Sequence, residues 1–147
     1  MQSTDPNYRV AYGAQEASAL ISSLFSRPIP DPGRAYGISN LDMLEVRFPN
    51  FIASFANFDR LEAKVPSRFI YTSARGPFIS GSDDLFMRRS KYLSPGQLAG
   101  CEDLTIVGDT VVFMTDTGTD VIAEAITSPT IAKQMISFFN FLWAFAE

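Results

Sequence analysis

The stretch LTIVGDTVVFMT, residues 104–115, predicts a β-hairpin. Two runs of β-branched and aliphatic residues flank Gly108 and Asp109, and a Gly-Asp pair between such runs is typical of a tight turn that joins two antiparallel strands. The next segment, TDVIAEAIT at residues 119–127, predicts a further strand. The second half of the chain is therefore expected to add antiparallel strands to a sheet.

Before this hairpin, predicted strands and helices alternate along the chain. Short runs of β-forming residues bounded by Gly or Pro predict strands at residues 8–13, 34–39, 67–73 and 91–93. Apolar residues at helical spacing predict helices at residues 14–27, 41–64 and 129–146, and a weaker one at 79–90.

The sequence indicates where two helices start and where one helical pattern is interrupted. Asn40 and Ser128 are expected to cap the helices that follow them, and Pro129 suits the first turn of the last helix. Pro49 falls inside the pattern at 41–64. That segment is therefore either one kinked helix or two helices that meet near Pro49.

The order of elements favours an α/β fold in a single domain. We expect a mixed, mostly parallel sheet flanked by helices, because strand and helix alternate through the first half. The chain should end in a long C-terminal helix. With 147 residues it fits one domain, assigned to residues 8–147, and residues 1–7 are interpreted as a leader or linker remnant.

Composition excludes several function classes. The net charge of −4 argues against nucleic-acid binding by this segment, because neutralising phosphates requires a basic surface. The single cysteine excludes an internal disulfide and fits a reducing compartment, so we expect a cytoplasmic protein. No apolar run reaches the length of a membrane span, and the first ten residues do not read as a signal peptide.

Several segments, taken in order, resemble one family. They are YRVAYGAQEASAL, AYGISN, FPNFIASFANFDRLEAKVPSRFIYTS, RRSKYLSP, LTIVGDTVVFMT and ITSPTIAKQMISFFNFLWAFA. This set resembles a phospholipase D-like domain of the type that forms the C-terminal half of TrmB-like transcriptional regulators. The resemblance implies a single phospholipase D-like half and a homodimer. It also implies that DNA is contacted only through an N-terminal domain, which this chain lacks.

The resemblance also allows the catalytic positions to be compared. Phospholipase D-type catalysis uses a His nucleophile, a phosphate-binding Lys and an Asp in the spacing H-x-K-x4-D. In this sequence those positions fall on Cys101, Asp103 and Gly108, and the chain contains no histidine. We therefore expect no catalysis. Cys101 is flanked by Glu102 and Asp103, which disfavour a reactive thiolate.

No cofactor or metal is predicted. A zinc site lacks its ligands in a chain with one cysteine and no histidine, and no Gly-rich phosphate loop has the required spacing. Acidic groups such as Asp83-Asp84 are interpreted as helix-start or turn residues. The basic group Arg88, Arg89 and Lys91 is either a solvated helix end or an anion site.

A small-molecule site is expected where strands end. In open α/β sheets ligands bind outside the carboxyl ends of the strands. On that basis the candidate ligand-binding residues are Ser39, Asn40, Arg68, Ser73, Arg75, Cys101 and Asp103. The expected effector is a sugar, a sugar phosphate or a nucleotide.

The last helix carries too many aromatic residues for one face. Successive residues turn by about 100° around a helix, so consecutive aromatics must point in different directions. Part of this helix is therefore either buried on two sides or held by a partner. We assign a dimer interface to Phe138, Phe141, Trp143 and Phe145.

Taken together, the sequence predicts a non-catalytic dimerisation and effector-sensing domain of a transcriptional regulator. Two alternatives stay open. One is a phosphodiesterase-like hydrolase that uses carboxylates or Cys101. The other is a stand-alone protein-interaction subunit.

Overall fold

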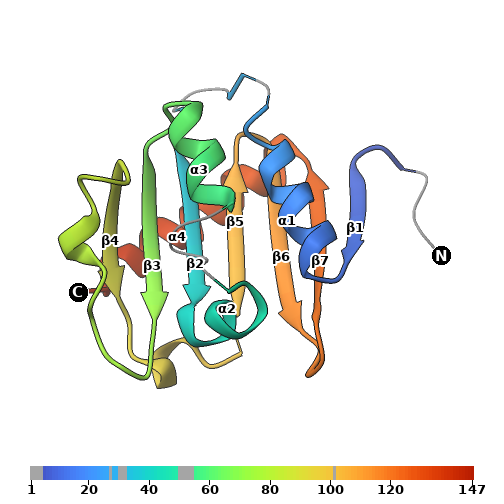
Figure 1. Ribbon diagram of the computed structural model, residues 1–147. Helices are drawn as coiled ribbons and strands as arrows, with labels where there is room; N and C mark the ends of the chain where they lie inside the picture. Colours follow the sequence, from blue (N-terminus) through green and yellow to red (C-terminus); the bar gives the residue numbers. More distant parts are fainter. Residues whose placement is uncertain (1–4, 27, 30–32, 50–54, 101) are drawn as a thin grey trace.

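The chain forms a seven-stranded sheet with helices on both faces (Figure 1). The structure is a computed structural model that describes residues 5–26, 28–29, 33–49, 55–100 and 102–147. Its strands are β1 (Tyr8–Tyr12), β2 (Ala35–Asn40), β3 (Ser67–Thr72), β4 (Arg88–Tyr92), β5 (Asp103–Val107), β6 (Thr110–Asp116) and β7 (Val121–Thr127). Their order across the sheet is β1-β7-β6-β5-β2-β3-β4.

The sheet is mixed and not mostly parallel, which corrects the sequence-based expectation. Only the pairs β2–β3 and β3–β4 are parallel, and the other described pairs are antiparallel. The reason lies between β4 and β5. Parallel neighbours need a crossover that returns the chain to the opposite edge. The link from β4 to β5 contains only a short 3₁₀ turn, η3 (Pro95–Leu98), so β5 starts at the edge where β4 ends.

The predicted hairpin is confirmed. β5 and β6 pair antiparallel, with Val107 opposite Thr110, and Gly108-Asp109 forms the two-residue connection. Gly108 has a φ of 60°, a conformation that glycine adopts without the steric cost of a Cβ atom. The turn also supports the last helix, because the Ser128 amide donates a 2.8 Å hydrogen bond to the carbonyl of Asp109.

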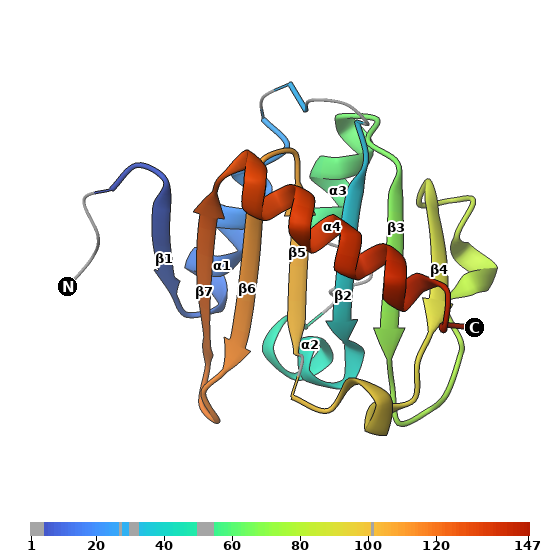
Figure 2. The same cartoon turned by 180° about the vertical axis from the view of Figure 1, so that it is seen from behind.

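Three helices cover one face of the sheet and one helix crosses the other (Figures 1 and 2). The first face carries α1 (Ala14–Ser23), α2 (Leu41–Arg47) and α3 (Phe55–Glu62). The opposite face is crossed by α4 (Pro129–Trp143), which runs from β7 towards β4. Each face has its own apolar core. In the part of the chain that is described, every helix is too short or too polar to cross a bilayer.

The helix predictions are confirmed in part. Asn40 caps α2, since its side-chain oxygen accepts hydrogen bonds from the amides of Asp42 and Met43 at 3.0 and 3.3 Å. Ser128 caps α4 in the same way, through the amide of Ile131. α2 ends at Arg47, before Pro49, so two helices form here rather than one. Residues 50–54, between them, lie outside the described part.

The segment at 79–90 is not the weak helix that its sequence predicts. It contains one 3₁₀ turn, η2 (Ser80–Ser82), and then enters β4 at Arg88, earlier than the strand expected at 91–93. Pairing with β3 outweighs local helical preference here, because each residue from Arg88 to Tyr92 has a register partner on β3.

The burial of α2 yields a testable contrast. Leu44 is fully buried, whereas Val46, two positions later on the same helix, is 68% exposed. Replacing Leu44 with Ala should lower the free energy of unfolding by about 2–5 kcal/mol. Val46→Ala should change it by less than about 0.5 kcal/mol. Urea denaturation of both variants measures this, and equal losses would show that α2 does not pack as described.

Candidate functional site

The candidate site lies on the α1–α3 face, where β2 ends and β5 begins. Ser39 on β2 and Asp103 on β5 are register partners, and the Ser39 hydroxyl donates a 2.6 Å hydrogen bond to Asp103 Oδ2. The Thr105 hydroxyl, one strand period further along β5, donates to Asp103 Oδ1 at 3.4 Å. Both carboxylate oxygens of Asp103 therefore have a hydroxyl partner.

Burial decides the protonation of this carboxyl group. Asp103 is buried in the protein, and the loss of solvent raises its pKa to about 7. The hydrogen bonds from Ser39 and Thr105 act in the opposite direction, because they favour the charged form. The outcome is a carboxyl group that exchanges its proton near neutral pH.

A small cavity adjoins this carboxyl group. Its volume is about 70 Å³, and Ser39, Asp103 and Thr105 supply polar groups to its lining. Further apolar walls come from both the sheet and the covering helices, namely Ile21, Phe25, Leu44, Phe69 and Met114. We call this space the Asp103 cavity. It is wide enough for a few water molecules, and a larger ligand requires its walls to move.

Other predicted residues hold α2 in place beside the cavity. Asn40 is used as the helix cap. The carboxylate of Asp42 accepts hydrogen bonds from the amide of Ala74 at 2.8 Å and from the hydroxyl of Ser73 at 3.3 Å. Arg75 forms an ion pair with Glu45, also on α2. The loop that follows β3 is thus fixed to α2.

The side of the site nearest β6 is held by charge pairs. Arg47, at the end of α2, donates to the carboxylate of Asp116 at 2.9 Å and to the carbonyl of Thr119 at 3.2 Å. The hydrogen bond from Arg47 holds the pKa of Asp116 below its usual value. Glu102 accepts a hydrogen bond from the amide of Asp116. α2 is therefore fixed to β6 on one side and to the loop after β3 on the other.

The structure brings only some of the predicted site residues together. Ser39 and Asp103 are in direct contact, and Asn40, Ser73 and Arg75 surround α2 next to them. Arg68 is separate, because it lies over Trp143 of α4 on the other face, 5.7 Å from the ring centre. Cys101 lies outside the described residues.

Sequence reasoning missed Thr105 and Arg60. Thr105 could have been found, because it is two positions after Asp103 on one strand and so faces the same side. Arg60 gave no such signal. It also lines the Asp103 cavity, and its guanidinium donates to the carbonyls of Val65, Phe86 and Met87. Burial and the nearby charge of Arg88 lower its pKa to about 10.

The chemistry available at the site is proton exchange and hydrogen bonding. In its ionised form Asp103 would repel a phosphate, and in its neutral form it can donate a hydrogen bond. Among the residues described, no three side chains of His, Cys, Asp or Glu converge as metal ligands. The site is thus suited to hydroxyl or amide groups of a neutral ligand.

Known structures share this fold at low sequence identity. TrmBL2, an archaeal chromatin protein whose structure shows a novel mode of DNA binding, superposes with a TM-score of 0.67 at 13% identity. The match covers all of this chain but 56% of TrmBL2, so the chain spans about half the length of that protein. No protein-family model matches the sequence, and no curated protein matches it either.

Two further structures also match, over nearly their full length. Nuc from Salmonella typhimurium, a phospholipase D family member, has a TM-score of 0.59 at 12% identity and is covered to 95%, as is this chain. NucT from Helicobacter pylori has a TM-score of 0.60 at 8% identity, with 98% of it and 95% of this chain covered. The predicted resemblance to a phospholipase D-like half is therefore confirmed at the level of fold.

The raised pKa of Asp103 predicts how stability depends on pH. The folded-state pKa of about 7 exceeds the ordinary value of 3.8, so the native state binds this proton more tightly than the unfolded chain. The resulting stabilisation is complete below pH 3.8 and is lost as the pH rises through 7. Its size is at most about 4 kcal/mol.

The Asp103→Asn variant cannot ionise and should lack this dependence. Urea denaturation between pH 4 and pH 8 should show the wild-type protein losing stability relative to the variant as the pH rises. Parallel profiles for the two proteins would mean that Asp103 ionises normally in the folded state.

Proposed function

We propose that this chain is a non-catalytic sensing and dimerisation domain of a DNA-binding regulator. The observation that carries the proposal is the buried Asp103. In the H-x-K-x4-D spacing of phospholipase D-type enzymes, the position of the phosphate-binding lysine falls on this residue. Its two oxygens are bonded to Ser39 and Thr105, so the group is integrated into the sheet and core.

A phosphodiesterase would need different groups at this point. Transfer of a phosphoryl group requires positive charge next to the phosphate oxygens. A carboxyl group at the lysine position supplies either negative charge or none. The Ser39 hydroxyl is not activated for attack by a histidine, because the chain contains none. We therefore assign no catalysis to the domain.

The likeness to TrmBL2 supports the regulator context. That protein is described as a chromatin protein that binds DNA, and this chain corresponds to about half of its length. We assign any DNA contact to a part of the regulator other than residues 8–147, because their sequence is acidic overall. A cytoplasmic location belongs to this proposal.

The Asp103 cavity is the proposed effector site. Its hydroxyl and carboxyl groups suit the hydroxyls of a sugar, and its apolar walls suit the carbon skeleton. Because the cavity holds about 70 Å³, a sugar can enter only if α2 or its neighbours move. Binding is thereby linked to a second conformation, and a ligand with higher affinity for that conformation shifts the population towards it.

We assign dimerisation to the outer face of α4 and to Phe145, which follows its last residue. Trp143, the fourth residue of the predicted interface, packs against the core instead. Phe138, Phe141 and Phe145 are 54%, 66% and 63% exposed, and the rings of Phe141 and Phe145 are in contact. Lys133 is the one charged residue in α4. An apolar and nearly uncharged helix face can pair with a second copy of itself without bringing like charges together.

Charged substitutions on this helix test the dimer. Phe141→Glu and Phe145→Glu should convert a dimer to a monomer, because each places a carboxylate in the apolar contact. Sedimentation velocity measures the mass. Leu85→Glu is the matched control, since Leu85 is 74% exposed but belongs to the segment between β3 and β4 and not to α4. A wild-type monomer at high concentration would contradict the assignment.

Phosphodiesterase activity is the test of the non-catalytic assignment. We expect no hydrolysis of bis(p-nitrophenyl) phosphate above the rate in buffer alone, from pH 5 to pH 8. Hydrolysis that disappears in Asp103→Asn or Ser39→Ala would instead establish an enzyme. Ser137→Ala is a suitable control, because Ser137 is exposed on α4 and distant from the site.

A further inference from the structure

A second hollow adjoins the Asp103 cavity at Ser67, which lines both. It is found where β2, β3 and β4 begin, and its volume is about 290 Å³. Four arginines line it, namely Arg34, Arg68, Arg88 and Arg89. We call it the arginine pocket. Such a concentration of positive charge is unexpected in a chain with a net charge of −4.

Among the described residues, a carboxylate partner is found for one of these four arginines. Arg88 binds Asp83 at 2.9 Å and is buried. In the described part of the chain, no carboxylate lies within 4 Å of the guanidinium nitrogens of Arg34, Arg68 or Arg89. The recorded contact of the Arg68 guanidinium is the ring of Trp143. Three cations at this edge of the sheet thus have no carboxylate partner among the described residues.

Their arrangement is unfavourable in the absence of an anion. Arg68 and Arg89 are register partners on adjacent strands, so their side chains leave the same face of the sheet as neighbours. Like charges directly opposite each other on paired strands destabilise a sheet. Lys91, two positions after Arg89 on that face, adds a further positive charge, held against Trp143. An anion bound between Arg68 and Arg89 would remove this repulsion.

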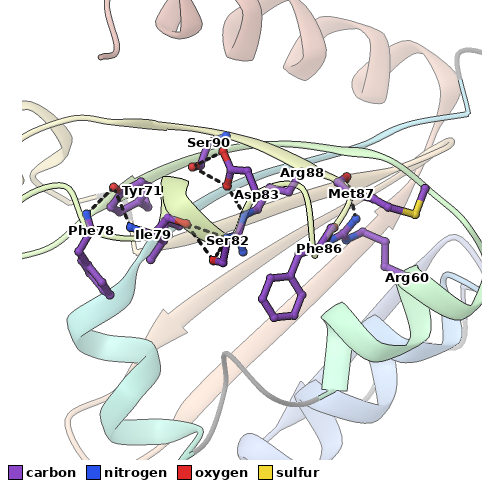
Figure 3. Close-up of polar contacts among 10 residues, drawn as sticks. All are labelled: Arg60, Tyr71, Phe78, Ile79, Ser82, Asp83, Phe86, Met87, Arg88 and Ser90. Carbon is purple, nitrogen blue, oxygen red and sulfur yellow. Dashed lines mark hydrogen bonds and ion pairs between the residues drawn. The ribbon is translucent and has the colours of Figure 1, made fainter.

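Asp83, an acidic residue that lines the pocket, already has partners for its carboxylate. Both oxygens of Asp83 accept hydrogen bonds from the hydroxyl of Ser90, and one also binds Arg88 (Figure 3). The Ser90 amide donates to Asp83 as well. Asp83 therefore fixes β4 to the preceding turn and is not available to neutralise Arg68 or Arg89. The remaining carboxylate of the pocket, Asp84, is exposed at its rim.

The wall of the pocket is held rigidly. Figure 3 shows Arg88 donating to the carbonyl of Ile79 and to the Ser82 hydroxyl, at 3.2 and 3.0 Å. From α3, Arg60 donates to the carbonyls of Phe86 and Met87. Two buried guanidinium groups thus hold the segment before β4 against the sheet. The unpaired arginines are presented by a framework that is formed before any ligand binds, which lowers the entropic cost of binding.

We propose that the arginine pocket binds the phosphate group of a small phosphorylated ligand, a sugar phosphate or a mononucleotide. Guanidinium groups bind phosphate oxygens through paired, charge-assisted hydrogen bonds, which Arg68 and Arg89 can supply from adjacent strands. Asp84 at the rim can accept a hydrogen bond from a sugar hydroxyl. A pocket of 290 Å³ is close to the lower limit for small-ligand sites, about 300 Å³. The polar groups of this site differ from those of the Asp103 cavity, although Ser67 lines both.

Calorimetric titration of the folded chain in phosphate-free buffer at low salt tests this site. Ribose 5-phosphate and AMP should bind saturably, and ribose and adenosine should not, because they lack the phosphate. Arg89→Gln should raise the dissociation constant about tenfold or more, the loss expected for a charge-assisted hydrogen bond. Arg89 is exposed, so this variant should keep its fold, which circular dichroism verifies.

Two further variants test whether binding depends on the arginines of this pocket. Arg68→Gln should weaken binding to a similar degree. Arg9→Gln should leave it unchanged, because Arg9 is an equally solvent-facing arginine on β1, at the other end of the sheet. Equal affinities of wild type and Arg89→Gln for AMP, or no saturable binding of either phosphate ester at millimolar concentration, would overturn the proposal. So would a short DNA duplex that binds through Arg89 when both small esters fail to bind.

Discussion

The antiparallel pairing of β5 with β2 is the constraint on which the rest of the structure depends. β5 is the central strand of the sheet, and it joins a parallel unit of β2, β3 and β4 to an antiparallel unit of β6, β7 and β1. Because β5 begins at the edge where β2 and β3 end, Asp103 is placed beside Ser39. The same strand leads through the Gly108-Asp109 turn to the support of α4. A single strand thus sets the sheet topology, the candidate site and the position of the last helix.

Placing a carboxyl group at the start of that central strand has a physical consequence. α2 covers this edge and is fixed to it through the Asn40 cap, the Asp42 contacts and the Arg47–Asp116 pair. Asp103 is thereby shielded from bulk solvent, and its proton affinity rises. A buried carboxyl group at this point supports our proposal of recognition rather than catalysis for this domain.

The two edges of the parallel unit differ in charge. The carboxyl edge carries a carboxyl group that loses its proton near neutral pH, and the amino edge carries three arginines without a carboxylate partner in the described chain. α4 contacts the amino edge through Trp143, which lies close to both Arg68 and Lys91. A phosphate bound at the amino edge would therefore act next to the helix that we assign to dimerisation. Under these two proposals, phosphate binding and dimerisation would be linked through contacts on the face of the sheet that α4 covers.

The sequence by itself determined most of the local structure. The Gly108 hairpin and the caps at Asn40 and Ser128 follow from residue types and their spacing. Such features depend on residues that are close in the chain, so their backbone preferences and hydrogen bonds can be inferred from the sequence. Pro49 indicated an interruption, but it left open whether one kinked helix or two helices form. The ordered set of segments carried the resemblance to a phospholipase D-like half. The sequence also indicated that Ser39 and Asp103 belong to one site. Only the tertiary structure decided that the sheet is mixed, that residues 88–92 form a strand, and that Arg68 faces α4, away from Asp103. Strand direction and burial depend on contacts between residues distant in the chain, and these contacts outweigh local preference.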